Sequence, residues 1–139
     1  MPHPPLVIPD LAIVPSSPSA KYLGAHFDRE LRWHVQAQYA VKRGLDWTLQ
    51  LRRLAKPSSG LSPGQIRRLF IAVALPKMGY ALDVWCSPLI DTGGTRLSGS
   101  VGHVKAMARV QRLGALAITG GLRTSPTAVL DAHAYLLPT

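Results

Sequence analysis

One helical stripe constrains the fold more than any other feature of this sequence. Small and apolar residues recur at alternating spacings of four and three, in the order Trp33, Ala37, Ala40, Gly44, Trp47, Leu51 and Leu54. This period places all seven residues on one face of a helix of about six turns. Because Ala37, Ala40 and Gly44 are small, we expect a second helix to approach closely between the two tryptophans. The stripe alone requires no more than an amphipathic core helix.

A β-hairpin is expected ahead of this helix. The apolar runs within residues 6–14 are β-like, and residues 22–27 can return as a second strand after a Pro- and Ser-rich loop. We predict that the hairpin closes at Asp28. The same Asp28 is a suitable N-cap for the long helix, with Glu30 in the first turn, where the helix dipole favours negative charge. An isolated hairpin is only marginally stable, so this one must pack on the helices.

Start and stop signals divide the rest of the chain. Ser62 and Gln65 form a capping box, with Pro63 at the first helical position. Pro76 is expected to kink or stop the helix that begins there, and an apolar piece continues over residues 78–85.

The C-terminal part is expected to add two helices. Residues 91–100 have the composition of a flexible linker, and a helix over 101–119 follows, with Gly120 at its end. Ser125 and the proline after it open a last short helix. The residues expected to be buried or aligned are Ala106, Met107, Val110, Leu113 and Ala117 in the first helix, and Val129, Leu130, His133 and Leu137 in the second.

The predicted fold is therefore mainly α, a helical bundle preceded by a short N-terminal β-hairpin. We divide the chain into a hairpin at 1–28, helices at 29–90, a linker at 91–100 and further helices at 101–139.

Charge favours a polyanionic partner, and the acidic residues do not indicate catalysis. Lys and Arg number 16 against 7 Asp and Glu, a net charge of +9, which favours nucleic acid or an anionic membrane surface.

The acids are scattered, the five histidines share no ligand spacing, and His103 is expected to be a packed core residue. No serine lies in a nucleophile elbow and no glycine run has the order of a phosphate loop. We expect no catalytic residue, no metal and no cofactor.

Other features bear on the compartment. Cys86 is the one cysteine, so an internal disulfide is excluded, and a buried thiol is expected. The first residues lack the pattern of a signal peptide, and residues 69–90 are interrupted by prolines and charges. We expect an intracellular chain without a membrane span, with nucleus and cytoplasm both left open.

The basic residues cluster on the predicted helices. Residues 21–56 alone carry eight basic and three acidic residues. A basic surface of this kind contacts phosphates without reading bases. Some of these charges also complement helix dipoles. A basic surface that is merely solvated is the alternative. The candidate phosphate contacts are Lys42, Arg43, Arg52, Arg53, Lys56, Arg67, Arg68, Lys105, Arg109 and Arg112.

Several short motifs together resemble one polymerase family. Residues 21–28, which include Tyr-Leu-Gly, are followed by Leu31 and Trp33. This run is similar to the segment just after the catalytic palm of non-LTR (LINE-type) retrotransposon reverse transcriptases, especially fungal ones. The resemblance covers nearly all of residues 11–139. Its other pieces are Arg52-Arg53-Leu54, Gly60-Leu61-Ser62-Pro63, the segments 74–81 and 83–86, Arg109-Val110-Gln111-Arg112-Leu113, Ile118-Thr119-Gly120, Arg123-Thr124-Ser125-Pro126-Thr127 and the segment 130–138.

The resemblance implies that residues 1–28 are the edge of the palm, that 29–90 are thumb-like and that 101–139 are a connection leading to a ribonuclease H domain. It implies weak, sequence-independent binding to a primer–template duplex, RNA–DNA or DNA, with Tyr22, Leu23 and Gly24 near the primer end. The metal-binding acids of the family lie in the palm and include an adjacent Asp pair, whereas this chain has no adjacent acids. We therefore expect a non-catalytic fragment of such an enzyme, which does not polymerise by itself. A separate palm domain is a candidate partner of this fragment.

Two other interpretations remain open. A repurposed helical protein-interaction module would have no nucleic-acid role and would expose aromatic residues in place of the palm contact. The aromatic residues concerned are Trp33, Trp47, Phe70 and Trp85. For the fragment interpretation, in which the palm is missing, the hairpin edge and several aromatic residues would face water, and this predicts self-association of the isolated chain. A membrane-surface protein is less favoured, because the basic residues are spread over several helices.

Overall fold

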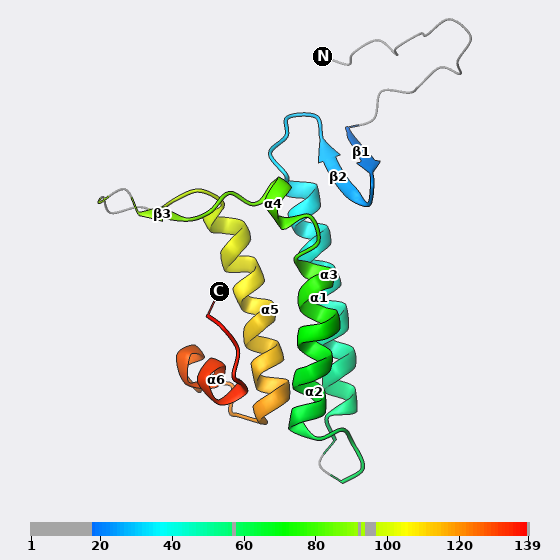
Figure 1. Ribbon diagram of the computed structural model, residues 1–139, viewed down its shortest axis with the longest axis vertical. Coiled ribbons are helices and arrows are strands. Elements are labelled where there is room, and N and C mark those ends of the chain that lie inside the picture. The colour runs from blue at the N-terminus through cyan, green and yellow to red at the C-terminus, as the bar shows by residue number, and fades with distance from the viewer. Residues whose placement is uncertain (1–17, 57, 92, 94–96, 139) are drawn as a thin grey trace, which may run out of the picture.

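A long central helix organises the chain. The computed structural model describes residues 18–56, 58–91, 93 and 97–138. Its elements are β1 (Ser19–Tyr22), β2 (Ala25–Asp28), α1 (His34–Leu54), α2 (Pro63–Leu69), the π-helical turn η1 (Phe70–Ala74), α3 (Leu75–Met78), α4 (Leu82–Trp85), β3 (Ile90–Asp91), β4 (Leu97–Ser98), α5 (Val101–Thr119) and α6 (Thr127–Ala134). The predicted class is confirmed, because the chain is mainly helical with a short antiparallel hairpin on its N-terminal side (Figure 1).

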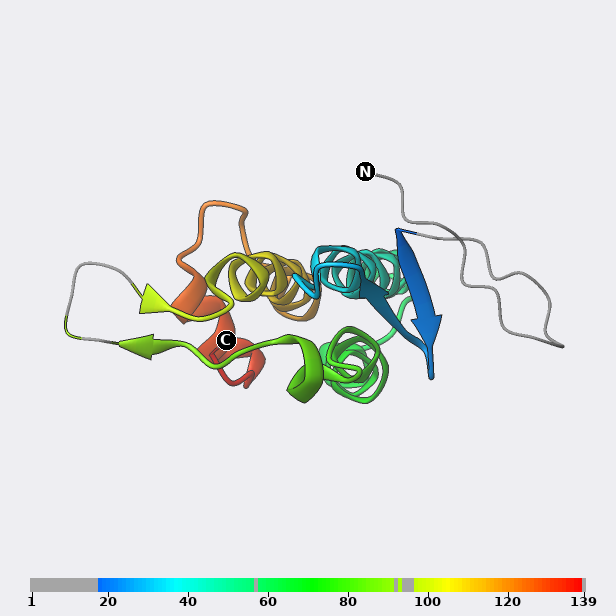
Figure 2. The same cartoon turned by 90° about the horizontal axis from the view of Figure 1, so that it is seen from above.

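The helices form two rows. Seen from above, α1 and α5 lie side by side in one row, and the α2–α3 helix and α6 lie against them in the other (Figure 2). The β1–β2 hairpin covers one end of α1, and the turn between α1 and α2 lies at the other end (Figure 1).

The hairpin has a different register from the one predicted. β1 and β2 pair antiparallel with Tyr22 opposite Ala25, so the turn consists of Leu23 and Gly24, with φ of 47° and 86°. Two successive positive φ angles are typical of the type I′ turn, which matches the twist of paired strands. The predicted single strand over 22–27 is therefore wrong, because this turn interrupts it. The predicted partner strand within 6–14 lies outside the described residues.

Helix α1 begins later than predicted. It starts at His34, preceded by Leu31 and Trp33, whose φ angles of 52° and 62° are left-handed and cannot belong to an α-helix. Asp28 ends β2 and uses its carboxylate oxygens to accept hydrogen bonds from the N–H groups of Arg32, at 3.0 Å, and Trp33, at 2.9 Å. It therefore closes the connection between hairpin and helix, and the prediction that it is the N-cap is wrong. Glu30 lies outside α1 and forms an ion pair with Arg32.

The capping box at α2 is confirmed. The N–H of Ser62 donates to Oε1 of Gln65 at 2.9 Å, and the N–H of Gln65 donates to Oγ of Ser62 at 3.4 Å.

The helix then continues through Pro76 and ends at Met78. It passes through the π-helical turn η1, where the N–H of Leu75 bonds to the carbonyl of Phe70. A π turn of this kind locally widens the helix.

The helix predicted over 101–119 is confirmed as α5, and Gly120, at φ 67°, ends it. Met107 and Val110 are buried as expected, but Ala106, Leu113 and Ala117 are only half-buried. The buried face is broader than one stripe because α1, α2 and α6 all pack on α5. Its additional buried residues are Gln111, Gly114, Ala115 and Ile118.

The last helix buries a different set of residues from the one aligned by spacing. Leu130 and Ala134 are buried in α6, whereas Val129 and His133 are exposed. Tyr135, at φ 52°, ends the helix, so Leu137 lies beyond it and is exposed. Within the region predicted as a linker, 91–100, the described residues include β4 and the end of β3, which pair with each other.

Close packing at the stripe is confirmed. A Cβ added to Gly44 would lie 2.9 Å from Sδ of Met78 and 3.0 Å from Cγ1 of Val110, so α3 and α5 both reach the backbone of α1 at this point. Phe70 and Trp85 are only 1% and 2% exposed. The partial exposure that the interaction-module interpretation predicts is therefore wrong for these two aromatic residues, whereas Trp33 and Trp47 are half-buried.

Candidate nucleic-acid interface

Most of the predicted phosphate contacts are exposed. Tyr22 and Leu23 are also exposed at the hairpin turn, whereas Gly24, Arg67 and Arg112 are half-buried. The exposed basic candidates are Lys42, Arg43, Arg52, Arg53, Lys56, Arg68, Lys105 and Arg109. Among the residues that the structure describes, the one ion pair joins Arg32 and Glu30, so none of these candidates is neutralised by a paired carboxylate.

The basic residues of α1 do not share one face. Arg43 and Arg52 are about two and a half turns apart and point to opposite sides of the helix. Arg43 lines a cavity toward α3, and Arg52 lines another cavity toward α5. Lys42 and Arg53 are about three turns apart and do share a side. Phosphate contacts along α1 would therefore belong to more than one surface.

Three basic residues lie together in sequence at the C-terminal end of α1. Arg52 and Arg53 are in the last turn, with Lys56 just beyond it. Arg52 lines a cavity of about 300 Å³ together with Arg123, which comes from the loop after α5. Because Arg123 follows a glycine pair in an unpatterned loop, helical spacing gave no signal that it belongs with Arg52.

Two predicted contacts have partners within the protein. The guanidinium of Arg67 donates to the carbonyls of Ala134, at 2.9 Å, and Tyr135, at 2.8 Å, and so satisfies carbonyls at the C-terminal end of α6. The guanidinium of Arg112 donates to Oγ1 of Thr127 and to the carbonyls of two residues in the α5–α6 loop, Arg123 and Ser125. Both arginines therefore join α6 and its loops to the bundle.

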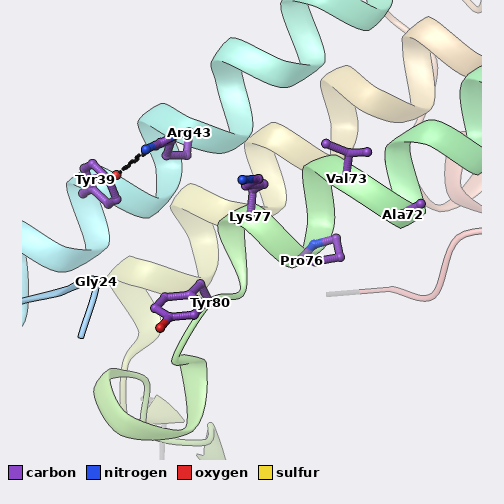
Figure 3. A pocket seen from close by; sticks show the side chains of 8 residues that line it. All are labelled: Gly24, Tyr39, Arg43, Ala72, Val73, Pro76, Lys77 and Tyr80. Atoms are coloured by element: carbon purple, nitrogen blue, oxygen red, sulfur yellow. Dashed lines mark hydrogen bonds between the residues drawn. The ribbon is translucent and has the colours of Figure 1, made fainter.

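A second basic cavity, of about 450 Å³, lies beside the hairpin turn. It is formed between α1, the η1–α3 helix and Gly24 (Figure 3). Its lining residues are Gly24, Tyr39, Arg43, Ala72, Val73, Pro76, Lys77 and Tyr80. The structure thus places two predicted residues, Gly24 and Arg43, in one pocket. Sequence analysis missed Lys77 and both tyrosines there, because they lie on elements far apart in the sequence.

The Tyr39 hydroxyl lies in a positive electrostatic environment in this cavity. It accepts hydrogen bonds from Nε of Arg43, at 2.9 Å, and Nη2, at 2.6 Å. The bond from Arg43 holds the pKa of Tyr39 below its ordinary value of 10.0 against the opposing effect of desolvation, and the charges of Arg43, Lys21 and Lys77 lower this pKa further.

The histidines form no metal site in the described part of the chain. No three His, Cys, Asp or Glu side chains gather there in a way that could hold an ion. His103 is half-buried and packs on the rings of His34 and Trp85, with centroid distances of 5.8 and 6.0 Å. Its Nδ1 is buried without a hydrogen-bond partner among the described residues. Cys86 is half-buried instead of buried.

His103 is expected to contribute an acid-sensitive part of the stability. Burial lowers the pKa of His103, and the neighbouring His34 lowers it further. The unfolded chain therefore takes up this proton at a higher pH than the native state does, so the contribution of His103 to stability is full above about pH 7 and falls as the pH decreases below about 6.5. We expect His103→Gln to lose less stability between pH 7 and pH 5 than the parent does, as measured by urea unfolding. The exposed His133→Gln is the matched control and should keep the profile of the parent. Identical profiles for all three proteins would contradict this assignment.

Comparison of the chain with models of protein families, with curated proteins and with solved structures finds no match in any of the three. Among the described residues, no helix is both long enough and apolar enough to cross a membrane.

Proposed function

We propose that this chain is the post-palm segment of a non-LTR retrotransposon reverse transcriptase and that it binds the phosphate backbone of a nucleic-acid duplex without catalysing polymerisation. The duplex is RNA–DNA or DNA, and the binding is weak and independent of base sequence. The observation that carries the proposal is the unpaired positive charge at the C-terminal end of α1, where Arg52, Arg53 and Lys56 are exposed and Arg123 lies across a shared cavity.

Phosphates are the ligand class that this arrangement favours. Exposed Arg and Lys side chains at and just beyond the ends of two helices can reach phosphate oxygens, and no base-reading element is needed for such contacts. A membrane surface fits less well, because its binding would require the charges to flank one continuous apolar helix face. Here the cations lie on opposite sides of α1.

A protein-interaction module is the second candidate function. Two of the four aromatic residues on which this interpretation depends, Phe70 and Trp85, are buried, and this weakens it. Other apolar side chains are strongly exposed, among them Leu23, at 76%, Tyr135, at 79%, and Leu137, at 87%. Exposed apolar side chains favour association with another protein. Self-association, in contrast, stays a prediction of the fragment interpretation, in which the palm partner is missing.

Salt dependence of duplex binding tests the proposed function. If Arg52, Arg53, Lys56, Arg68 and Arg123 each contact a phosphate, the logarithm of affinity for B-form DNA should fall against the logarithm of salt concentration with a slope of about −4.5. The double variant Arg52→Ala/Arg53→Ala should flatten this slope by about 1.8, and two duplexes of unrelated sequence should give the same values. The measurement is fluorescence anisotropy at several salt concentrations.

Lys105→Ala/Arg109→Ala provides a comparison, because it removes the same charge from the other long helix, α5. Its slope shows whether α5 also contacts the duplex. Equal slopes for the parent and the Arg52/Arg53 variant would mean that those arginines are merely solvated, and the proposal would lose its main support.

A further inference from the structure

The cavity beside the hairpin turn has the composition of a ligand site. Its volume of about 450 Å³ lies within the range of roughly 300–1,000 Å³ typical of small-molecule sites. Its floor is apolar and consists of Ala72 and Val73, on the π-helical turn η1, and Pro76, on α3. Such π-helical turns occur frequently at functional sites.

One side of the cavity is cationic. Arg43, from α1, and Lys77, from α3, both line this side (Figure 3). Arg43 is held by its two bonds to the Tyr39 hydroxyl, which leave the other N–H donors of its guanidinium for a ligand. None of the described residues that line the cavity is acidic. The cavity therefore suits an anion that accepts hydrogen bonds from both cations.

The other side is an aromatic wall held in place by the fold. The Tyr80 hydroxyl donates to the carbonyl of Leu23 at 2.7 Å, and the indole N–H of Trp85 donates to the carbonyl of Tyr80 at 2.9 Å. A Cβ on Gly24 would lie 3.2 Å from Cε1 of Tyr80, so glycine lets the turn approach the ring. Tyr80 itself is 54% exposed, which leaves ring surface open for stacking.

We propose that this cavity binds an unpaired nucleotide, with its phosphate on Arg43 and Lys77 and its base stacked against Tyr80. An inorganic anion would use only the cationic side, and an uncharged aromatic ligand would use only the wall, whereas a nucleotide uses both. The inference rests on the proposed function, because it takes the ligand from nucleic acid and adds a site for a single nucleotide to the duplex contacts.

Titration with adenosine 5′-monophosphate tests the site. We expect the mononucleotide to bind at least about tenfold more tightly than either adenosine or inorganic phosphate, as measured by NMR shifts of residues that line the cavity. Lys77→Gln should weaken mononucleotide binding about tenfold, and Tyr80→Leu should weaken it by a similar factor while leaving inorganic phosphate unaffected. Arg29→Gln removes an exposed positive charge that lies outside the cavity lining and outside the candidate phosphate contacts, so it should have no effect. Equal effects of Lys77→Gln and Arg29→Gln, or equal affinities for nucleotide and phosphate, would overturn the proposal.

A measurement on the parent protein avoids dependence on the folding of the variants. An anion bound beside Arg43 should raise the pKa of Tyr39 toward its ordinary value, because it offsets the neighbouring positive charge. The change can be followed through the tyrosine ring carbons by NMR with and without mononucleotide. An unchanged pKa of Tyr39 at saturating mononucleotide would also overturn the proposal.

Duplex ligands test whether the bound nucleotide comes from nucleic acid. They also separate this inference from the proposed binding of a duplex. A duplex with a one-nucleotide overhang should bind more tightly than a blunt duplex, and Lys77→Gln should abolish that difference without changing the salt slope by more than about 0.9. Binding of the free mononucleotide without any preference for the overhang would contradict a nucleic-acid source. A steep salt slope without nucleotide binding would overturn only this inference, and nucleotide binding with a flat slope would overturn only the duplex proposal.

Discussion

Phe70→Ala is expected to lower the free energy of unfolding by about 3–5 kcal/mol, a large part of the roughly 5–15 kcal/mol typical of a whole domain. Phe70 is 1% exposed and lies in the core cluster that joins α1, α2, α5 and α6, with Leu51, Ile66, Ala115 and Leu130. Truncation would remove the ring and leave a cavity that helices on both sides cannot easily fill. Urea unfolding followed by far-UV circular dichroism measures the loss.

The close contact between Phe70 and α5 makes this prediction specific. A Cβ on Gly114 would collide with Cε2 of Phe70, so the ring packs directly on the α5 backbone. We expect Gly114→Ala to destabilise the parent by about 1–3 kcal/mol. In the Phe70→Ala background the same substitution should cost far less, because the clash is gone and Ala is the better helix former.

Gly102 provides the control on the same helix. A Cβ there would meet nothing within 4 Å, so Gly102→Ala should be neutral or stabilise by up to about 1 kcal/mol. If Gly114→Ala had the same effect in both backgrounds, the proposed contact with Phe70 would be refuted.

The elements that follow from local chemistry were predictable from the sequence. The period of the stripe gave the long helix, Ser62 and Gln65 gave the start of α2, and Gly120 gave the end of α5. Each of these signals depends on residues within one or two turns of each other. The start of α1 was misplaced, because two non-glycine residues, Leu31 and Trp33, adopt left-handed φ angles that propensity does not predict.

Tertiary contacts explain the remaining errors in the fold. A single stripe was expected on α5, but the helix is covered by neighbours on several sides, so residues such as Gln111 and Gly114 are buried. The hairpin turn at Leu23 was hidden within an apolar run that resembles a continuous strand, and only the glycine after it indicates a turn.

The candidate site was predictable in its charge but not in its geometry. Exposed basic residues were found because Lys and Arg stand out on amphipathic helices. Their grouping depends on long-range packing, which places Arg123 in one cavity with Arg52 and Lys77 in another cavity with Arg43. The same packing engages Arg67 and Arg112 with backbone carbonyls, which a count of positive charges cannot reveal.

Trp85 should be the corresponding centre of the second core cluster. It is 2% exposed and packs with Ala37, Met78, Met107 and Val110, where α1, α3 and α5 meet. Trp85→Ala is expected to reduce the free energy of unfolding by about 3–5 kcal/mol, because it removes the largest fully buried side chain of the described residues.

Trp85→Phe separates the packing of this side chain from its hydrogen bond. The variant retains an aromatic ring but loses the indole N–H that donates to the carbonyl of Tyr80, so we expect a loss of about 1–3 kcal/mol. Because that bond also positions the wall of the cavity, mononucleotide binding by the folded variant should weaken. Trp47→Phe is the matched control, since Trp47 is half-buried in the other cluster and should leave nucleotide affinity unchanged. Unfolding by urea at constant pH gives the stabilities. Equal losses for Trp85→Phe and Trp47→Phe, with equal nucleotide affinities, would show that the bond to Tyr80 neither stabilises the fold nor shapes the cavity.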